Sequence, residues 1–169
     1  MRRRILLATV VAGFFFATQA EAQNCNTPEL TQKLSIFSEY AKAKNYKEAY
    51  PIWKEVYTQC PTLHYATFAY GERILQDKIR TSNGAEKTQF VKELLQMYTD
   101  YNKHFASRFN ATEMRIRQAL LMFDEKAGSE QEIYDLLHKA FTEGKNDFKN
   151  EKIATHDSST QQLIEFYKH

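Results

Sequence analysis

The chain has 169 residues, a length that suits one domain with a hydrophobic core. It has only five glycines and three prolines, and 14% of its residues are aromatic. This composition favours a packed helical protein over a disordered chain. The formal charge of +2 belongs to the first 22 residues, because the remainder has 20 basic and 20 acidic side chains. No basic surface is left that would bind nucleic acid or an anionic membrane.

The N-terminal residues 1–22 have the pattern of a secretory signal peptide. Arg2–Arg4 form a positive start, and Ile5–Phe16 is an apolar run too short to span a bilayer comfortably. Ala20–Ala22 is a small-residue cleavage site, so cleavage is expected before Gln23. The alternative is an uncleaved membrane anchor. No lipoprotein motif precedes Cys25, so lipid attachment is not expected. The chain is therefore predicted to be exported to the periplasm or the outer cell envelope.

The first helix is predicted over residues 28–44. Thr27 is a capping hydroxyl, and Pro28 suits the first helical position. The apolar residues recur at the spacing of one buried helix face, at Leu30, Leu34, Phe37 and Ala41.

A second helix is predicted over residues 45–60 and ends at Pro61. Asn45 and Glu48 have the spacing of a capping box. Pro51 lies inside the helix, where it removes a backbone hydrogen bond, so we expect it to kink the helix or to shift its start. The predicted apolar stripe consists of Ala49, Trp53, Val56 and Cys60.

The later helices follow from the same periodicity. Ser129 and Glu132 form a further capping box, and Gly144 is the expected end of that helix. The predicted ranges are 63–80, 85–105, from 110 or 112 to 127, 130–143, and a short last helix over 158–168. Residues 23–144 are thus expected to form the helical domain, and residues 145–169 a polar loop with a short C-terminal helix.

No segment shows the strict alternation of a strand, so the chain is predicted to be all-α, with six or seven helices in stacked antiparallel hairpins. Helices that open hairpins are expected near residues 28, 63 and 111. The first interval matches the repeat of about 34 residues of tetratricopeptide proteins. The second interval is longer, which we assign to a stretched loop around Ser82.

Several short runs resemble the exported tetratricopeptide-repeat proteins of Bacteroidetes. They are residues 34–46, Ala49–Trp53, Cys60–Pro61 and Tyr70–Gly71. The resemblance covers about residues 25–141, and the chain departs from the repeat pattern at Phe37, which occupies a position for a small residue. The resemblance implies an exported helical scaffold of the cell envelope. It implies no settled biochemical role, and no catalytic residues are carried over from it. Ala49 and Gly71 are the small residues expected at close helix crossings.

The two cysteines, Cys25 and Cys60, are predicted to form a disulfide. An exported chain meets an oxidising compartment, and in an antiparallel hairpin the two positions lie at the same end. Closing this loop would stabilise the fold by about 3–4 kcal/mol. The alternative is two free thiols, with Cys60 filling the helix interface.

Catalytic and metal-binding patterns are not found in the sequence. The five histidines have no i, i+4 pair and no His-Glu-x-x-His run. The glycines are too far apart for a phosphate-binding loop, and no serine has a triad context. Asp124 and Glu125 are interpreted as a solvated face rather than a glycosidase pair. We therefore expect no cofactor, no metal and no enzymatic activity.

The first helix of each hairpin is expected to line a concave groove. By position, this groove would expose polar and aromatic side chains suited to an extended peptide. The predicted binding residues are Ser38, Lys42, Tyr65, Glu72 and Gln76.

The function predicted from these features is a non-enzymatic scaffold for protein–protein interaction in the cell envelope. Its partner would be a protein or peptide, and membrane association would pass through that partner. The alternatives are a glycan- or ligand-binding helical-repeat protein and, with less support, a hydrolase. The identity of the partner and the oligomeric state stay open.

Overall fold

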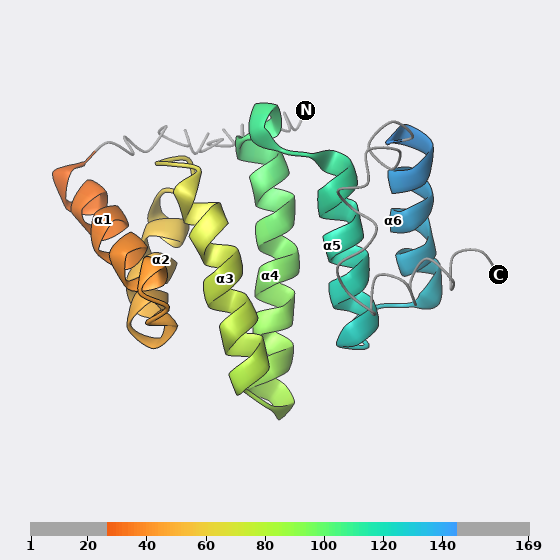
Figure 1. Ribbon diagram of the computed structural model, residues 1–169, viewed down its shortest axis with the longest axis horizontal. Helices are drawn as coiled ribbons and strands as arrows, with labels where there is room; N and C mark the ends of the chain where they lie inside the picture. Colours follow the sequence, from red (N-terminus) through yellow and green to blue (C-terminus); the bar gives the residue numbers. More distant parts are fainter. Residues whose placement is uncertain (1–26, 145–169) are drawn as a thin grey trace, which may run out of the picture.

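The computed structural model describes residues 27–144 and confirms the all-α prediction (Figure 1). No strand occurs within this range. The elements are α1 (Pro28–Lys42), α2 (Tyr46–Gln59), α3 (Ala66–Thr81), α4 (Gly84–His104), the 3-10 helix η1 (Ala106–Arg108), α5 (Ala111–Asp124) and α6 (Glu130–Glu143). The predicted signal peptide, Cys25 and the predicted C-terminal helix lie outside the described residues.

The helices form three hairpins that follow one another in a row from α1 to α6 (Figure 1). The most extensive contacts lie within the hairpins, between α1 and α2, α3 and α4, and α5 and α6. Contacts of α2 with α3, and of α1 with α3, join the first two hairpins, whereas α5 joins the third hairpin to α4. The result is a stack in which each hairpin buries its apolar face against its neighbours.

The spacing of the hairpins differs from the predicted repeat. α3 begins at Ala66, so the first interval is 38 residues from Pro28 and not about 34. Residues 60–65 form turns, with the Leu63 amide donating to the Cys60 carbonyl. α3 therefore begins later in the chain than predicted. The predicted stretched loop around Ser82 is also wrong, because α3 ends at Thr81 and α4 begins at Gly84. The extra length lies in the 21 residues of α4 and in the segment containing η1.

Three of the six α-helix starts in the described range have side-chain caps, at Thr27, Asn110 and Ser129. Thr27 accepts a hydrogen bond from the Leu30 amide at 3.3 Å, and Ser129 forms the complete capping box with Glu132. The capping box predicted at Asn45 is wrong, because that side chain makes no cap hydrogen bond. Pro51 lies within a helix that continues from Tyr46 to Gln59.

Gly71 lies at a close helix crossing, as predicted. A Cβ atom at this position would be 2.5 Å from Trp53 Nε1 and 2.8 Å from Met97 Sδ. Trp53 is fully buried, and its Nε1 donates to the Thr67 carbonyl at 2.7 Å. Ala49 is also fully buried. α2, α3 and α4 can approach this closely because Gly71 contributes no side chain.

The core consists of two apolar clusters. The larger one extends through α1 to α4 and includes Met114 of α5, and the smaller one joins α5 to α6 through Ala119, Met122, Ile133 and Leu137. Leu95 of α4 packs against both clusters. The apolar residues of α6 recur at helical spacing, which predicts one buried stripe of Ile133, Leu136, Leu137, Ala140 and Phe141. This stripe is only partly buried, because Phe141 is 45% exposed.

Cys60 is buried at the end of α2 and is disulfide-bonded. Since Cys25 lies outside the described residues, its pairing with Cys60 stays a prediction. Within residues 27–144, the helices lack the combination of length and apolar character that a membrane crossing requires.

Candidate functional site

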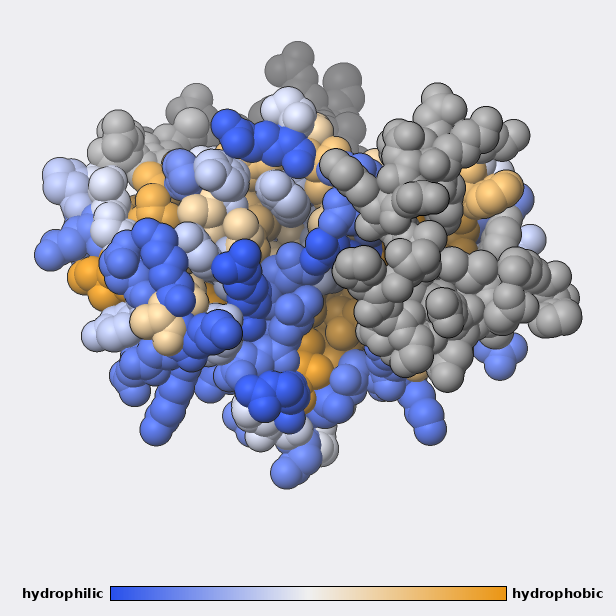
Figure 2. Space-filling model, viewed as in Figure 1, coloured by the Kyte–Doolittle hydropathy of each residue, from blue (hydrophilic) through white to orange (hydrophobic). Residues whose placement is uncertain are grey.

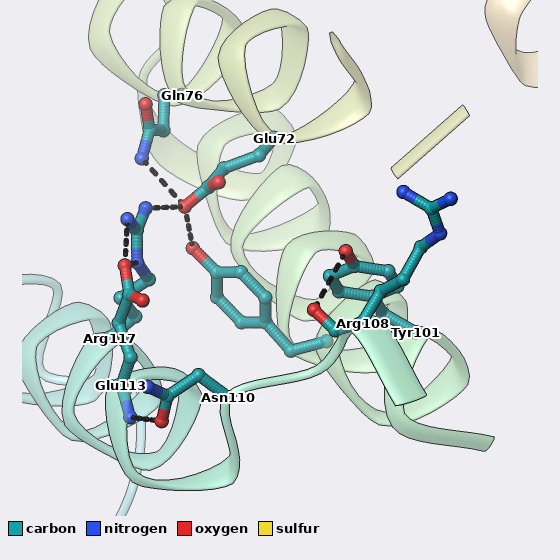
Figure 3. Close-up of polar contacts among 8 residues, drawn as sticks. Glu72, Gln76, Tyr101, Arg108, Asn110, Glu113 and Arg117 are labelled. Atoms are coloured by element: carbon teal, nitrogen blue, oxygen red, sulfur yellow. Dashed lines mark hydrogen bonds and ion pairs between the residues drawn. The ribbon is translucent and has the colours of Figure 1, made fainter. Parts of the chain in front are cut away.

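A polar cluster joins α3, α4 and α5 (Figure 3). At its centre is the carboxylate of Glu72, whose Oε1 accepts hydrogen bonds from Tyr98 Oη at 2.8 Å and Arg117 Nη1 at 2.5 Å. Gln76 Nε2, one turn further along α3, donates to the same oxygen at 3.4 Å. The three donors come from three helices, so the cluster fixes the third hairpin relative to the second.

Arg117 is itself held by a second carboxylate. Its Nε and Nη2 donate to Glu113 Oε1 at 3.1 and 2.5 Å, one turn earlier in α5. Asn110 caps this helix by accepting from the Glu113 amide at 3.0 Å (Figure 3). Because Arg117 donates to Glu72 and Glu113 together, its guanidinium has little freedom to turn away from α3.

The Tyr98 hydroxyl is fixed as a hydrogen-bond donor. Burial, followed by the nearby charge of Glu72, raises the pKa of Tyr98 above its ordinary value. The phenol therefore stays protonated at neutral pH and donates to the carboxylate. This arrangement is suited to holding helices in place rather than to transferring a proton near neutral pH.

A cleft of about 620 Å³ opens beside this cluster, between α3, α4 and α5. We call it the α3–α5 cleft. Its floor and walls include four apolar residues, Ile79, Leu94, Leu120 and Leu121, and its polar lining consists of Gln76, Arg80, Lys87, Tyr98, Arg117, Asp124 and Glu125. Figure 2 shows hydrophobic surface bordered by hydrophilic surface in the gap between α4 and α5.

Ion pairs hold the charged rim of the α3–α5 cleft. Lys87 of α4 pairs with Glu125 at the end of α5 at 2.6 Å, and Arg80 pairs with Asp77 within α3. These pairs and the Arg117–Glu72 pair place both signs of charge around an apolar floor. Since Arg80 is largely exposed, its pair contributes little to stability and can exchange for another partner.

The predicted binding residues separate into three places. Gln76 lines the α3–α5 cleft and Glu72 lies directly beside it. Lys42 is exposed on α1 and pairs with Glu39 at 2.7 Å. The predicted exposure of Ser38 is wrong, because the residue is only 8% exposed and its hydroxyl donates to the Leu34 carbonyl at 2.6 Å.

Tyr65 forms a separate surface patch at the start of α3. Its ring is 38% exposed and is covered on one side by the Arg108 guanidinium, 4.5 Å from the ring centroid. The His64 ring lies 4.5 Å away on the same turn. Arg108 is anchored through its carbonyl, which accepts from Tyr101 Oη at 3.5 Å (Figure 3).

Several residues of the cleft were not predicted as binding residues. Tyr98, Leu120 and Leu121 lie at the spacing of a buried helix face, so the sequence alone indicates core positions for them. For Arg117, the sequence offers one indication of a structural role, which is Glu113 four residues earlier. This spacing favours an ion pair on one helix. Its contact with Glu72, 45 positions away, has no signature in the periodicity.

Within the described range, no group of three or more His, Cys, Asp or Glu side chains could hold a metal ion. The interpretation of Asp124 and Glu125 as a solvated face holds only for Asp124, which is exposed, because Glu125 is partly buried in its pair with Lys87.

A scan against protein-family models matches no family, and comparisons with curated proteins and with solved structures return no match. The function of the candidate site is therefore inferred from its geometry alone.

Proposed function

We propose that this chain is a non-enzymatic interaction scaffold of the tetratricopeptide-like kind, in which the α3–α5 cleft binds a short segment of a partner protein. The observation that carries the proposal is the apolar floor of Ile79, Leu94, Leu120 and Leu121 inside a rim of paired charges. Its volume of about 620 Å³ lies within the range of ligand pockets, about 300–1,000 Å³.

A peptide segment suits this site better than a small charged molecule. Apolar side chains of the segment would bury surface on Leu120 and Leu121, and this contact supplies most of the affinity. Polar groups of the segment would contact the rim, where Arg80 and Lys87 can exchange their present partners. The Glu72–Arg117 pair fixes α5 relative to α3 before binding, which lowers the ordering cost of association.

Export to the periplasm or outer envelope is part of the same proposal. Cys60 is disulfide-bonded and buried, and disulfides persist in oxidising compartments. The signal-peptide pattern of residues 1–22 agrees with this location.

The test uses the chain from Gln23 to His169 and a displayed library of random peptides. Peptides that bind are labelled, and their affinity is measured by fluorescence anisotropy for the unmodified chain, for Leu120→Glu and for the control Ile36→Glu. Leu120 is a half-buried wall residue of the cleft, and Ile36 is a 39% exposed apolar residue on α1.

We expect Leu120→Glu to weaken binding at least about tenfold, because a carboxylate is placed on the apolar wall. Ile36→Glu should leave the affinity unchanged. Thermal denaturation confirms that both variants are folded. Equal binding to all three proteins, or no peptide enriched by the unmodified chain, would contradict the proposal.

A second candidate function, glycan binding, is favoured by the Tyr65 patch. A partly exposed tyrosine beside Arg108 and His64 offers apolar contact and hydrogen bonding together, which suits a sugar ring. A glycan array with the unmodified chain and Tyr65→Ala tests this function. Saturable binding that Tyr65→Ala abolishes would support it, and an array without binding would remove it.

A further inference from the structure

We propose that residues 158–168 of this same chain form a short helix that occupies the α3–α5 cleft, so that a partner must displace it. The inference rests on the proposed function in one respect, because it assigns a regulator to the proposed binding site. The occupancy itself can be tested without any partner. Three features support it: the apolar lining of the cleft, the reach of the chain after α6, and the pattern of the segment.

Half of the apolar lining of the cleft is left partly exposed, because Ile79 and Leu94 are already buried whereas Leu120 and Leu121 are not. Leu120 and Leu121 are only half-buried, although each packs against one of the two core clusters. Figure 2 shows hydrophobic surface at this place. Covering it would stabilise the fold by about 25 cal/mol for each Å² of apolar surface removed from water.

The reach of the chain is sufficient. Gly144, after the end of α6, lies against Thr112 in the first turn of α5, where a Cβ atom on the glycine would be 2.2 Å from Thr112 Oγ1. The cleft lies along the second half of α5, from Arg117 to Glu125. α5 has 14 residues and is therefore about 21 Å long. The 13 residues 145–157 can extend over about 43 Å, twice that length.

The pattern of residues 158–168 matches an apolar cleft with a polar rim. At 100° per residue, one side of the helix carries Leu163, Ile164, Phe166 and Tyr167, and the opposite side carries Gln161, Glu165 and Lys168. An isolated helix of 11 residues is marginal in water. The segment therefore needs a surface that covers its apolar side, and the partly exposed Leu120 and Leu121 of the cleft provide one.

Tethering favours the chain's own segment over a free peptide. A short flexible linker gives an effective concentration in the millimolar range. A free peptide with the same sequence then competes poorly for the cleft unless the tethered copy is disabled. This competition provides the test.

The experiment uses a labelled synthetic peptide of residues 158–169 and the chain from Gln23 to His169. Its affinity is measured for the unmodified chain, for Leu163→Glu with Ile164→Glu, and for the control Gln161→Glu with Gln162→Glu. The control adds the same charge on the polar side. We expect the peptide to bind the first double variant at least about tenfold more tightly than the other two proteins.

A cross-linking experiment gives an independent readout in the full chain. A photo-reactive phenylalanine analogue replaces Tyr167, and mass spectrometry locates its products. We expect intramolecular products on α3, α4 and α5 within residues 76–125. Products only on α1 or α2, or only between two molecules, would overturn the inference, and so would equal affinity of the peptide for all three proteins. Library peptides selected on the Leu163→Glu, Ile164→Glu variant, whose cleft is free of the segment in either case, would still test the proposed function, so the two failures are distinguishable.

Discussion

The substitution Gly71→Ala tests the close packing on which the whole stack depends. In the structure, the added Cβ would lie 2.5 Å from Trp53 Nε1, 2.7 Å from Trp53 Cε2 and 2.8 Å from Met97 Sδ. All three distances are shorter than ordinary van der Waals contacts, so neighbouring atoms must move. The thioether of Met97 can swing aside at low cost, because it is flexible.

The indole of Trp53 cannot move as easily. Rotating it away from Gly71 strains or breaks the hydrogen bond from Nε1 to the Thr67 carbonyl, which is 2.7 Å long and buried. Overpacking costs about 1–3 kcal/mol, and a buried donor left without its acceptor costs about 1–3 kcal/mol more. The better helix propensity of alanine offsets about 1 kcal/mol of this destabilisation. We therefore expect Gly71→Ala to lower the free energy of unfolding by about 1–5 kcal/mol.

Urea denaturation followed by tryptophan fluorescence measures this change, because Trp53 is the only tryptophan of the chain and lies at the crossing itself. The control is Ala69→Gly, at an exposed position of the same helix. It should cost about 1 kcal/mol through helix propensity alone. If Gly71→Ala were as stable as the unmodified chain while Ala69→Gly behaved as expected, the close crossing of α2, α3 and α4 would be refuted.

Three further predictions concern the disulfide, the polar cluster and alkaline pH. Cys60→Ser should lower the free energy of unfolding by about 2–5 kcal/mol, and thermal denaturation of the unmodified chain with and without a reducing agent should give a difference of the same sign. Glu72→Gln removes the charge that holds Arg117, so hydrogen exchange measured by mass spectrometry should accelerate in α5 and α6 but not in α1; a uniform acceleration would argue against the cluster as a local clamp. Burial raises the pKa of Tyr98 above its ordinary value and that of Tyr50 to about 12. Unfolded tyrosine ionises near pH 10. The stabilisation that these protonated tyrosines give the folded state is therefore fully present below about pH 10 and is lost as the pH rises through their folded-state pKa values. Denaturant titrations at several alkaline pH values should show a steady fall in the free energy of unfolding.

The helix starts show how far local patterns can be trusted. Ser129 precedes α6 with an extended backbone, ψ 156°, and its capping box forms. Asn45 belongs to the same residue pattern but has ψ 66°. The turn before it sets this angle, because Lys44 has φ +57° and the Asn45 amide donates to the Tyr40 carbonyl at 2.8 Å. A capping side chain needs an extended backbone to reach the first turn, and the preceding turn does not follow from the pattern of Asn45 and Glu48.

Spacing along the chain was a weaker guide than composition. The small and polar residues 81–84 correctly predicted a break between two helices, yet the connection itself is only Ser82 and Asn83. Gly84, the first residue of α4, has φ +55°, which glycine adopts without strain. Because this turn is tight, the additional residues of the second interval belong to α4 and to the connection around η1. The composition of residues 81–84 indicates that the chain turns there. The number of residues in the turn depends on backbone angles, which composition does not determine.

The sequence also does not determine whether a small polar residue such as Ser38 is buried or exposed. Ser38 was expected in the groove because of its place on the first helix, but its hydroxyl donates one turn back to the Leu34 carbonyl at 2.6 Å. This local hydrogen bond lets serine enter a helix interface at little cost. The same residue type therefore fits a groove or an interface, and only the packing of α1 decides between them.

The α3–α5 cleft depends on contacts between hairpins and could not be derived from any single helix. α5 packs on α4 and is connected to α3 by the long side chains of Arg117 and Glu72, which meet at 2.5 Å. A polar bridge of this length holds the two helices further apart than direct apolar packing would, so Leu120 and Leu121 stay half-buried beside Leu94. Helical periodicity identifies these leucines as inward-facing, but it does not show that the neighbouring helix stands too far away to cover them. The binding surface is therefore set by the bridge between two hairpins, which is why disrupting Glu72 should alter the cleft without unfolding α1 and α2.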